Sequence, residues 1–285
     1  MKPSRFEYVR PSSIEEAVKA RTAFADTVIL AGGQSLMPMM NFRIAQPDAV
    51  IDISRIPGLD RIEVTDEGVT VGAMVRSRAL ELHDGAHRTA PVLRAALRHV
   101  AHVPIRNRGT VCGSIAHADS AAELPAVLLA LDGHVVATGP AGERTIPAAE
   151  LFTFHMTTTV RPDEIVTRAF FPAQRPGERH AFLEHARRQG DYAVAAVCAL
   201  VAMDGGRVAS ARLSACGIAD TPVRLSASEA ALAGRALDEA ALSEAGRLAR
   251  EAVTNETDGL GGAYRRRLLE TLERRAVAAA AGRGG

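Results

Sequence analysis

The chain has 285 residues, enough for about two domains of ordinary size. Its 34 basic and 33 acidic residues leave a net charge of +1, so no general attraction to nucleic acid is expected. The sequence contains no run of about 18 apolar residues and no apolar leader, so we expect no transmembrane segment and a cytoplasmic protein.

The first 60 residues have the pattern of a β-α-β unit. Ser13 and Glu16 form the S-x-x-E pattern of a capping box, which predicts a helix over about 14–24. Short apolar runs before and after this helix predict strands. The expected strands are 6–9, 27–30 and 49–53.

The middle of the chain combines a hairpin, helices and single strands. Residues 91–102 have a helical pattern, whereas 109–114 are too rich in glycine and polar residues for a helix. Ser120 and Glu123 form a second capping box, which predicts a helix through about Leu131. The expected strands are 61–64, 69–73, 135–138 and 165–171.

A proline-rich, polar segment at 172–177 is the best domain boundary. It separates an expected first domain, 1–175, from a second one, 176–285. After it the sequence predicts three antiparallel strands, followed by helix to about residue 280, so the class is α+β. The three strands are expected at 181–187, 193–203 and 208–216, with a turn at Asp204, Gly205 and Gly206 between the last two.

The three cysteines lie far apart, and none belongs to a C-x-x-C pair. A zinc or iron–sulfur site held by cysteines of this chain is therefore not expected, and we assign no metal ligand. No Ser/His/Asp or Cys/His set can be assembled, so no catalytic residue is assigned either. The cysteines are Cys112, Cys198 and Cys216.

Two glycine-containing loops fall at the junctions of predicted elements. Glycine permits a positive φ, so successive backbone N–H groups of such loops can converge on an anion such as a pyrophosphate. A tight turn is the simpler interpretation of either loop alone. The dinucleotide fingerprint G-x-G-x-x-G is absent, which disfavours a Rossmann site. The loops are Ala31, Gly32, Gly33, Gln34, Ser35 and Thr110, Val111, Cys112, Gly113, Ser114.

Both loops lie in recognisable segments. AGGQSLMPMMNFRIAQPDAVIDISRI at 31–56 and IRNRGTVCGSIAHADSAAELPAVLLALDG at 105–133 resemble the FAD-binding medium subunit of carbon monoxide dehydrogenase-type molybdenum hydroxylases, the xanthine dehydrogenase family. The opening FEYVRPSSIEEAV and the segment RQGDYA at 188–193 fit the same family. The resemblance covers essentially the whole chain, and the combination of the two loops makes it specific.

The resemblance implies a fold of the type shared with vanillyl-alcohol oxidase and p-cresol methylhydroxylase. Two subdomains, about 1–57 and 58–175, would hold FAD between them, and the C-terminal α+β domain would cover the site. The pyrophosphate would lie on the backbone of the two loops.

The resemblance also places three side chains near the cofactor. Asp119 and Glu123 would accept hydrogen bonds from ribityl or ribose hydroxyls, and Tyr192 would pack by the flavin ring. Each has a simpler interpretation: Glu123 as the acid of the capping box, Asp119 as a cap of the same helix, and Tyr192 as an ordinary strand aromatic.

Cys112 departs from the family's usual T-x-G-G-S. Its Cβ requires a negative or strained φ, but its N–H can still donate, so FAD binding is expected to persist. A thiol near the flavin could alter its redox tuning or be prone to oxidation. A small buried apolar residue is the favoured interpretation.

The resemblance therefore implies an electron-transfer subunit. FAD would receive electrons from two [2Fe–2S] clusters in a separate small chain and pass them to an external acceptor. A separate large chain would carry the molybdopterin, and the assembly would be a dimer of heterotrimers. Two alternatives remain: a free-standing FAD oxidoreductase, which would turn over a substrate alone, and a non-enzymatic module that has lost flavin, which would be colourless.

Overall fold

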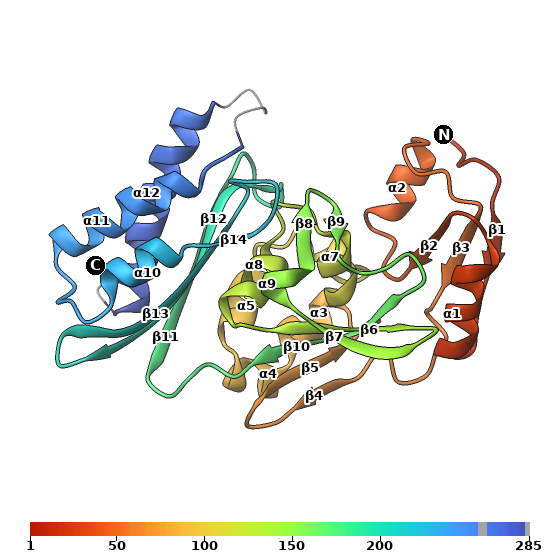
Figure 1. Cartoon of the computed structure of the whole chain (residues 1–285), viewed down its shortest axis with the longest axis horizontal. Helices are drawn as coiled ribbons and strands as arrows, with labels where there is room; N and C mark the ends of the chain where they lie inside the picture. Colours follow the sequence, from red (N-terminus) through yellow and green to blue (C-terminus); the bar gives the residue numbers. More distant parts are fainter. Residues whose placement is uncertain (256–260, 283–285) are drawn as a thin grey trace.

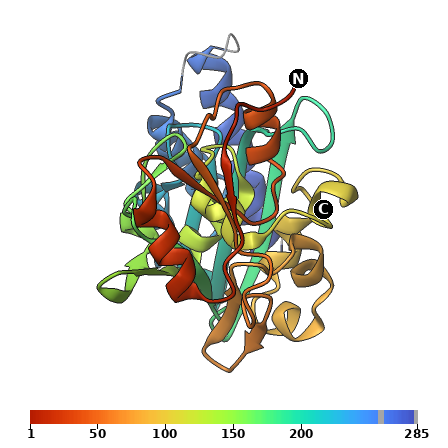
Figure 2. The ribbon, with the colours of Figure 1, turned by 90° about the vertical axis from the view of Figure 1, so that its right-hand side faces the viewer.

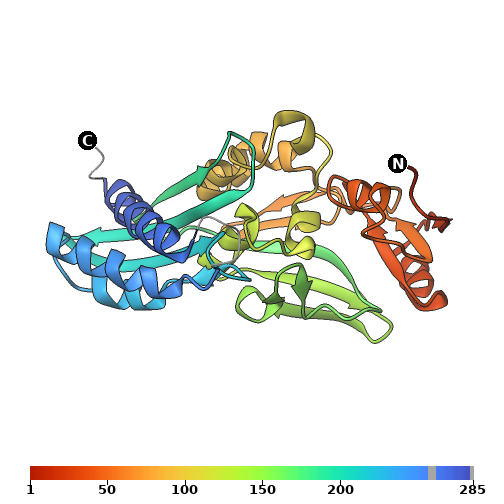
Figure 3. The same ribbon diagram turned by 90° about the horizontal axis from the view of Figure 1, so that it is seen from above.

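The three larger β-sheets follow one another along the long axis of the molecule, each with its own helices (Figure 1). The computed structural model describes residues 1–255 and 261–282. The N-terminal sheet lies at one end, the largest sheet lies in the middle, and the C-terminal sheet lies at the other end, an order also visible from above (Figure 3). No helix in these two ranges is long and apolar enough to cross a membrane.

The N-terminal unit is a three-stranded parallel sheet of order β1-β3-β2. The predicted helix is confirmed, because α1 begins after Ser13, whose hydroxyl accepts a hydrogen bond from the N–H of Glu16 at 3.2 Å. In a standard capping box the Glu16 carboxylate would accept from the N–H of the N-cap residue, Ser13. Here it accepts instead from the N–H of Ser12, at 2.8 Å. The elements are β1 (Glu7–Val9), α1 (Ile14–Ala23), β2 (Thr27–Leu30), α2 (Leu36–Asn41) and β3 (Ala49–Asp52).

The middle sheet is antiparallel, with strand order β4-β5-β10-β6-β7. Its helices gather on one face, where α8 is buried at every position because it lies between this sheet and the C-terminal one. Its strands are β4 (Ile62–Val64), β5 (Gly68–Gly72), β6 (His134–Gly139), β7 (Gly142–Pro147) and β10 (Ile165–Pro172). Two further strands, β8 (Phe152–Phe154) and β9 (Thr157–Thr158), form a small antiparallel sheet of their own. The helices are α3 (Ser77–Leu82), α4 (Asp84–Thr89), α5 (Val92–Leu97), α6 (Val103–Arg106), α7 (Val111–His117), α8 (Glu123–Ala130) and α9 (Ala148–Leu151).

The C-terminal sheet confirms the three predicted antiparallel strands. Gly205 and Gly206 form the predicted turn between two of them, with φ of 52° and 80°. One face of the sheet packs on helices α10–α12 and the other on α8, so its central strand β12 is buried on both sides. The elements are β11 (Glu178–Ala186), β12 (Ala193–Asp204), β13 (Arg207–Cys216), β14 (Val223–Arg224), α10 (Ser226–Leu232), α11 (Glu239–Ala249), the short 3-10 helix η1 (Arg250–Ala252) and α12 (Gly262–Ala280).

Two predictions for the segment between Gly109 and Glu123 were wrong. A helix, α7, begins inside the glycine-containing segment 109–114, because the Thr110 hydroxyl accepts from the N–H of Gly113 at 3.1 Å and caps it. The apolar face of α7 is fully buried, which offsets the low helix propensity of glycine. The second capping box does not form: α8 begins at Glu123 after Ala122, and the Ser120 hydroxyl bonds instead to Nδ1 of His155 at 3.1 Å.

Candidate functional site

A cleft of about 770 Å³ opens where the N-terminal unit, the middle domain and a loop of the C-terminal domain meet. Figure 2 views the molecule from the N-terminal end, where β2 and α2 stand against the middle domain. Every predicted site residue except Val111 lines the cleft. From the first loop these are Ala31, Gly32, Gly33, Gln34 and Ser35; from the second, Thr110, Cys112, Gly113 and Ser114; and from later segments, Asp119, Glu123 and Tyr192.

The two glycine loops touch backbone to backbone. A Cβ added at Gly32 would lie 2.6 Å from the carbonyl oxygen of Arg108, 2.8 Å from Cα of Gly109 and 3.0 Å from the nitrogen of Thr110. These three neighbours are backbone atoms, which cannot rotate away as a side chain would. Only glycine therefore fits at position 32 with the loops in this arrangement.

The first loop presents free backbone donors to the cleft. Within the described residues, the N–H groups of Gly32, Gly33, Gln34 and Ser35 donate to no protein acceptor. Gly33 has a φ of 71°, a value that turns successive N–H groups toward one side of the chain. Such a series of donors forms a concave site for an anion.

The second loop is more fully bonded within the protein. The Val111 N–H donates to the carbonyl of Val75 at 3.0 Å, and the N–H groups of Gly113 and Ser114 both bond to Thr110. In the part of the chain that the structure describes, the N–H groups of Thr110 and Cys112 have no protein acceptor. The second loop thus contributes fewer free donors than the sequence suggested.

The side chains of Val111 and Cys112 point into the core rather than into the cleft, although Cys112 also contributes to the cleft wall. Val111 is fully buried, which explains why it does not line the site. The Cys112 thiol is 2% exposed and donates to the carbonyl of Val71 at 3.5 Å, and burial raises its pKa to about 12. Cys112 has no positive φ, so the favoured interpretation, a small buried apolar residue without backbone strain, is confirmed.

Asp119, Glu123 and Tyr192 meet at one end of the cleft. One carboxylate oxygen of Asp119 accepts from the N–H of Ala121 at 2.9 Å, in a turn that precedes α8 rather than as its cap. Burial raises the pKa of Glu123 to about 7, and the charge of Asp119 adds to the rise. Desolvation raises the pKa of Tyr192, and the charge of Asp119 adds to the rise. Ser35 of the first loop acts on the same hydroxyl, so the first loop and the tyrosine face one another.

Three arginines at the cleft were not predicted from the sequence. Arg21 lines it from α1, Arg161 from the loop before β10, and Arg106 from the end of α6. The Nε atom of Arg21 is buried without a hydrogen-bond partner in the described ranges. Arginines in a cleft that also contains free N–H donors favour an anionic ligand. The sequence did not indicate these three arginines because they lie outside the glycine loops and belong to no recognisable motif.

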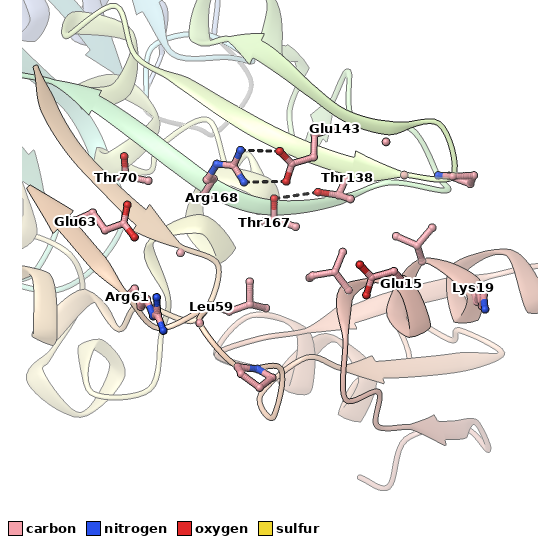
Figure 4. A pocket seen from close by; sticks show the side chains of 18 of the residues that line it. Glu15, Lys19, Leu59, Arg61, Glu63, Thr70, Thr138, Glu143, Thr167 and Arg168 are labelled. Atoms are coloured by element: carbon pink, nitrogen blue, oxygen red, sulfur yellow. Dashed lines mark hydrogen bonds and ion pairs between the residues drawn. The ribbon is translucent and has the colours of Figure 1, made fainter.

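A second cavity, of about 970 Å³, lies between α1 and the middle sheet (Figure 4). Arg168 and Glu143 form a two-bond ion pair on its sheet side, with distances of 2.7 and 2.8 Å. Glu15 and Lys19 face it from α1. Neither glycine loop lines this cavity, so it offers none of the free backbone donors that distinguish the cleft.

Comparison with known proteins agrees with a flavin-binding α+β protein in two parts. Residues 4–174 match the family described as the FAD binding domain in molybdopterin dehydrogenase. Residues 180–280 match the CO dehydrogenase flavoprotein C-terminal domain. The gap between the two matches contains the end of the linker between β10 and β11.

Individual relatives span the whole chain. The chain is 38% identical to the 6-hydroxypseudooxynicotine dehydrogenase complex subunit alpha of Paenarthrobacter nicotinovorans, over 98% of this chain and 96% of that one. It is 34% identical to the carbon monoxide dehydrogenase medium chain of Afipia carboxidovorans, over 97% of both. It also superimposes on carbon monoxide dehydrogenase from Hydrogenophaga pseudoflava with a TM-score of 0.96, covering 100% of both chains at 35% identity.

The chain therefore belongs to the family of FAD-binding medium subunits of carbon monoxide dehydrogenase-type molybdenum hydroxylases. Its cofactor is FAD. The residues of the cleft fit this cofactor, because the free N–H groups beside Gly32 suit a pyrophosphate and the polar groups of Asp119 and Glu123 suit its hydroxyls.

Proposed function

We propose that this chain binds FAD in the cleft and relays electrons through it within a molybdenum hydroxylase complex. The contact between the glycine loops carries this proposal, since it brings free N–H donors from two distant segments into one concavity. In this arrangement the N–H groups of 32–35 would hold the pyrophosphate, with those of Thr110 and Cys112 and the Ser114 hydroxyl as further donors.

The flavin end of the cofactor would lie where Asp119, Glu123 and Tyr192 meet, beside the first loop. The two carboxyl groups would hold hydroxyls there, and Tyr192 would cover the ring from the C-terminal domain. When bound, FAD accepts electrons and passes them on, which is chemistry that the side chains of this protein do not perform. The protein's own contribution is to bind the cofactor, orient it and restrict water around it.

The partners of this chain follow from its family. We infer a small chain with two [2Fe–2S] clusters as electron donor, a large chain with the molybdopterin centre, and a dimer of heterotrimers in the cytoplasm. The relatives are subunits of complexes named for different substrates, such as 6-hydroxypseudooxynicotine and carbon monoxide, so the substrate belongs to the complex rather than to this chain.

A cofactor measurement on the purified full chain tests the proposal. Flavin absorption near one equivalent per chain, with FAD rather than FMN released on heating, supports it. A chain that stays colourless and takes up no added FAD contradicts it. Turnover of a substrate by the chain alone would instead favour a free-standing oxidoreductase.

Gly32→Ala sharpens this test. The added Cβ meets three backbone atoms at 3.0 Å or less, so the loops must separate and their donors no longer converge. We expect the dissociation constant for FAD to rise about tenfold or more, equivalent to about 1.4 kcal/mol. Flavin fluorescence titration of the chain without cofactor measures it.

Gly205→Ala is a suitable control for the strain of an added methyl group. Gly205 lies in the β12–β13 turn with a φ of 52° and no atom within 4 Å of an added Cβ. This change adds local backbone strain away from the cleft, so FAD affinity should stay within about twofold of the unmodified chain. Equal losses of affinity in both variants would contradict the assignment of the loops.

A further inference from the structure

Glu184, on β11, places a carboxyl group inside the protein next to the cleft without lining it. Its side chain is 4% exposed, and its Oε2 atom is buried with no hydrogen-bond partner among the described residues. An unsatisfied buried carboxyl is costly, so its presence in a folded protein needs a reason.

The register of the C-terminal sheet shows where Glu184 points. Glu184 pairs with Ala196 of β12, which pairs with Cys216 of β13, and such cross-strand partners share one face of a sheet. On this face the Cys216 thiol donates to the carbonyl of Ala121 at 3.7 Å, just before α8. Glu184 therefore faces the start of α8, where Glu123 stands.

The two carboxyls are close enough to interact. Burial raises the pKa of Glu184 to about 8, and the negative charge of Glu123 contributes to the rise. Two buried carboxyls that repel one another do not both ionise at neutral pH, so the pair retains a proton. The pair thus holds a proton directly beside the cleft that Glu123 lines.

His99 connects this pair to the surface. Its Nδ1 atom lies 3.8 Å from Oε1 of Glu184, and its side chain is 37% exposed. The ring packs on Phe182, with ring centroids 5.4 Å apart, which holds it against β11. The three titratable groups consequently run in series from the cleft, through Glu123 and Glu184, to a histidine that solvent can reach.

Other ionisable groups near this series do not interrupt it. Asp119 and Arg106 act on Glu123 with opposite signs, the aspartate raising its pKa and the arginine lowering it. The Cys216 thiol lies on the same sheet face, but burial raises its pKa well above the ordinary value, so it stays protonated. Desolvation lowers the pKa of His99, which lets this imidazole release a proton readily.

We propose that Glu123, Glu184 and His99 form a proton path between the cleft and the surface. The inference rests on the proposed function, since full reduction of FAD consumes two electrons and two protons and its reoxidation releases them. The electrons come from the iron–sulfur partner and the protons from water. Glu123 releases a proton toward the cleft, Glu184 reprotonates Glu123, and His99 reprotonates Glu184 with a proton taken from solvent.

Proton uptake by the FAD-loaded full chain tests the outer end of the path. The flavin is photoreduced with EDTA as electron donor in weakly buffered solution, and a pH indicator follows proton uptake. We expect His99→Gln to slow uptake about tenfold or more, and added imidazole to restore it, because general acid–base groups contribute at least this much. A purely structural role of His99 would not respond to imidazole.

His185→Gln is the matched control, because His185 is exposed on the same strand, next to Glu184. Its proton uptake should equal that of the unmodified chain, with or without imidazole. Unaltered uptake in His99→Gln, or equal slowing in both variants, would overturn the path.

Infrared spectroscopy of the chain without FAD tests the carboxyl pair independently. The measurement uses the Glu273→Gln background, because burial also raises the pKa of Glu273 to about 8. In this background we expect protonated-carboxyl bands that disappear as the pH rises from about 6 to about 9, the window of the two raised pKa values of Glu123 and Glu184. Glu184→Gln should remove the band that titrates near pH 8 and leave the one near pH 7, because Glu123 ionises first, while Glu184 is still neutral. A chain with no such bands overturns the pair. A chain that shows them but takes up no FAD contradicts the proposed function instead.

Discussion

Glu273 offers a direct test of how burial controls ionisation in this protein. It lies on α12, is 0% exposed, and neither of its carboxylate oxygens has a hydrogen-bond partner in the described ranges. Burial raises its pKa from 4.5 to about 8, whereas the charge of Arg274 acts in the opposite direction. The folded protein therefore holds Glu273 in its neutral form at neutral pH.

The sign of the pH effect follows from these two pKa values. The unfolded chain releases this proton near pH 4.5 and the folded chain only near pH 8, so the unfolded state binds fewer protons between them. The contribution of Glu273 to stability is thus greatest below about pH 4.5 and is lost as the pH rises through about 8. The loss amounts to about 1 kcal/mol by pH 5, about 3 by pH 7 and about 5 by pH 9.

Glu273→Gln removes the ionisation and keeps the size of the side chain. We expect the free energy of unfolding of the variant, relative to that of the unmodified chain, to increase with pH, by about 2 kcal/mol between pH 5 and pH 7 and about 4 kcal/mol between pH 5 and pH 9. Urea denaturation of both chains at these pH values measures the two free energies of unfolding. Their difference contains only the effect of Glu273, because all other groups titrate alike in the two chains.

Glu251→Gln serves as the control because Glu251 is exposed at the end of the same helical region. Its stability difference from the unmodified chain should not change with pH. A difference for Glu273→Gln that is equally flat from pH 5 to pH 9 would refute the reasoning, since it would mean that Glu273 ionises normally in the folded protein.

Three further predictions concern buried groups. Arg106→Met should cost about 2 kcal/mol of unfolding free energy, because the buried Glu81, 2.9 Å away and 8% exposed, then keeps only the partly exposed Arg78 as its partner. A thermal melt that shows no loss would contradict this. Glu178→Ala should cost a similar amount, since the Glu178 side chain is 0% exposed and is paired with the buried Arg212 of β13 at 2.6 Å. Asp132→Asn should cost under about 1 kcal/mol, because the Asp132 side chain is 52% exposed. Equal costs of the two substitutions would refute the role of burial. Cys112 and the other two buried cysteines should not react with a thiol reagent until the chain unfolds; labelling of the folded chain would contradict their burial.

Local patterns in the sequence predicted the elements whose signals are themselves local. The cap of α1 and the turn at Gly205 and Gly206 each depend on neighbouring residues, and both were predicted correctly. The extent of the helix expected at 91–102 was not, because α5 ends at Leu97 before the chain turns toward α6. The predicted domain boundary near 175 remains a prediction, although β10 ends at Pro172 and β11 begins at Glu178.

The start of α7 shows why other elements were missed. The segment from Thr110 appears unsuited to a helix by composition, yet burial of Val111 and Ile115 against the middle sheet makes it one. That burial depends on contacts with strands about 40 residues away in the sequence, which no local window contains. For the same reason Ser120 bonds to His155 of the β8–β9 hairpin instead of capping α8.

The cleft is a more extreme case, because its parts become a site only when the chain is folded. The sequence drew attention to both glycine loops, but not to the contact at Gly32 that joins them or to the arginines that flank them. Volume alone would have selected the larger cavity beside α1.

Free backbone donors distinguish the two cavities, and they depend on which N–H groups the fold has already used. Val111 is the clearest example: its N–H donates to the carbonyl of Val75 and is therefore not available to a ligand in the cleft. A binding loop of this kind is therefore defined as much by the hydrogen bonds it leaves unmade as by its glycines. Unsatisfied oxygens also distinguish the two buried glutamates. Glu184 has an unpaired oxygen and lies beside His99, which solvent can reach, whereas Glu273 has two unpaired oxygens and is buried on α12, outside the lining of the cleft.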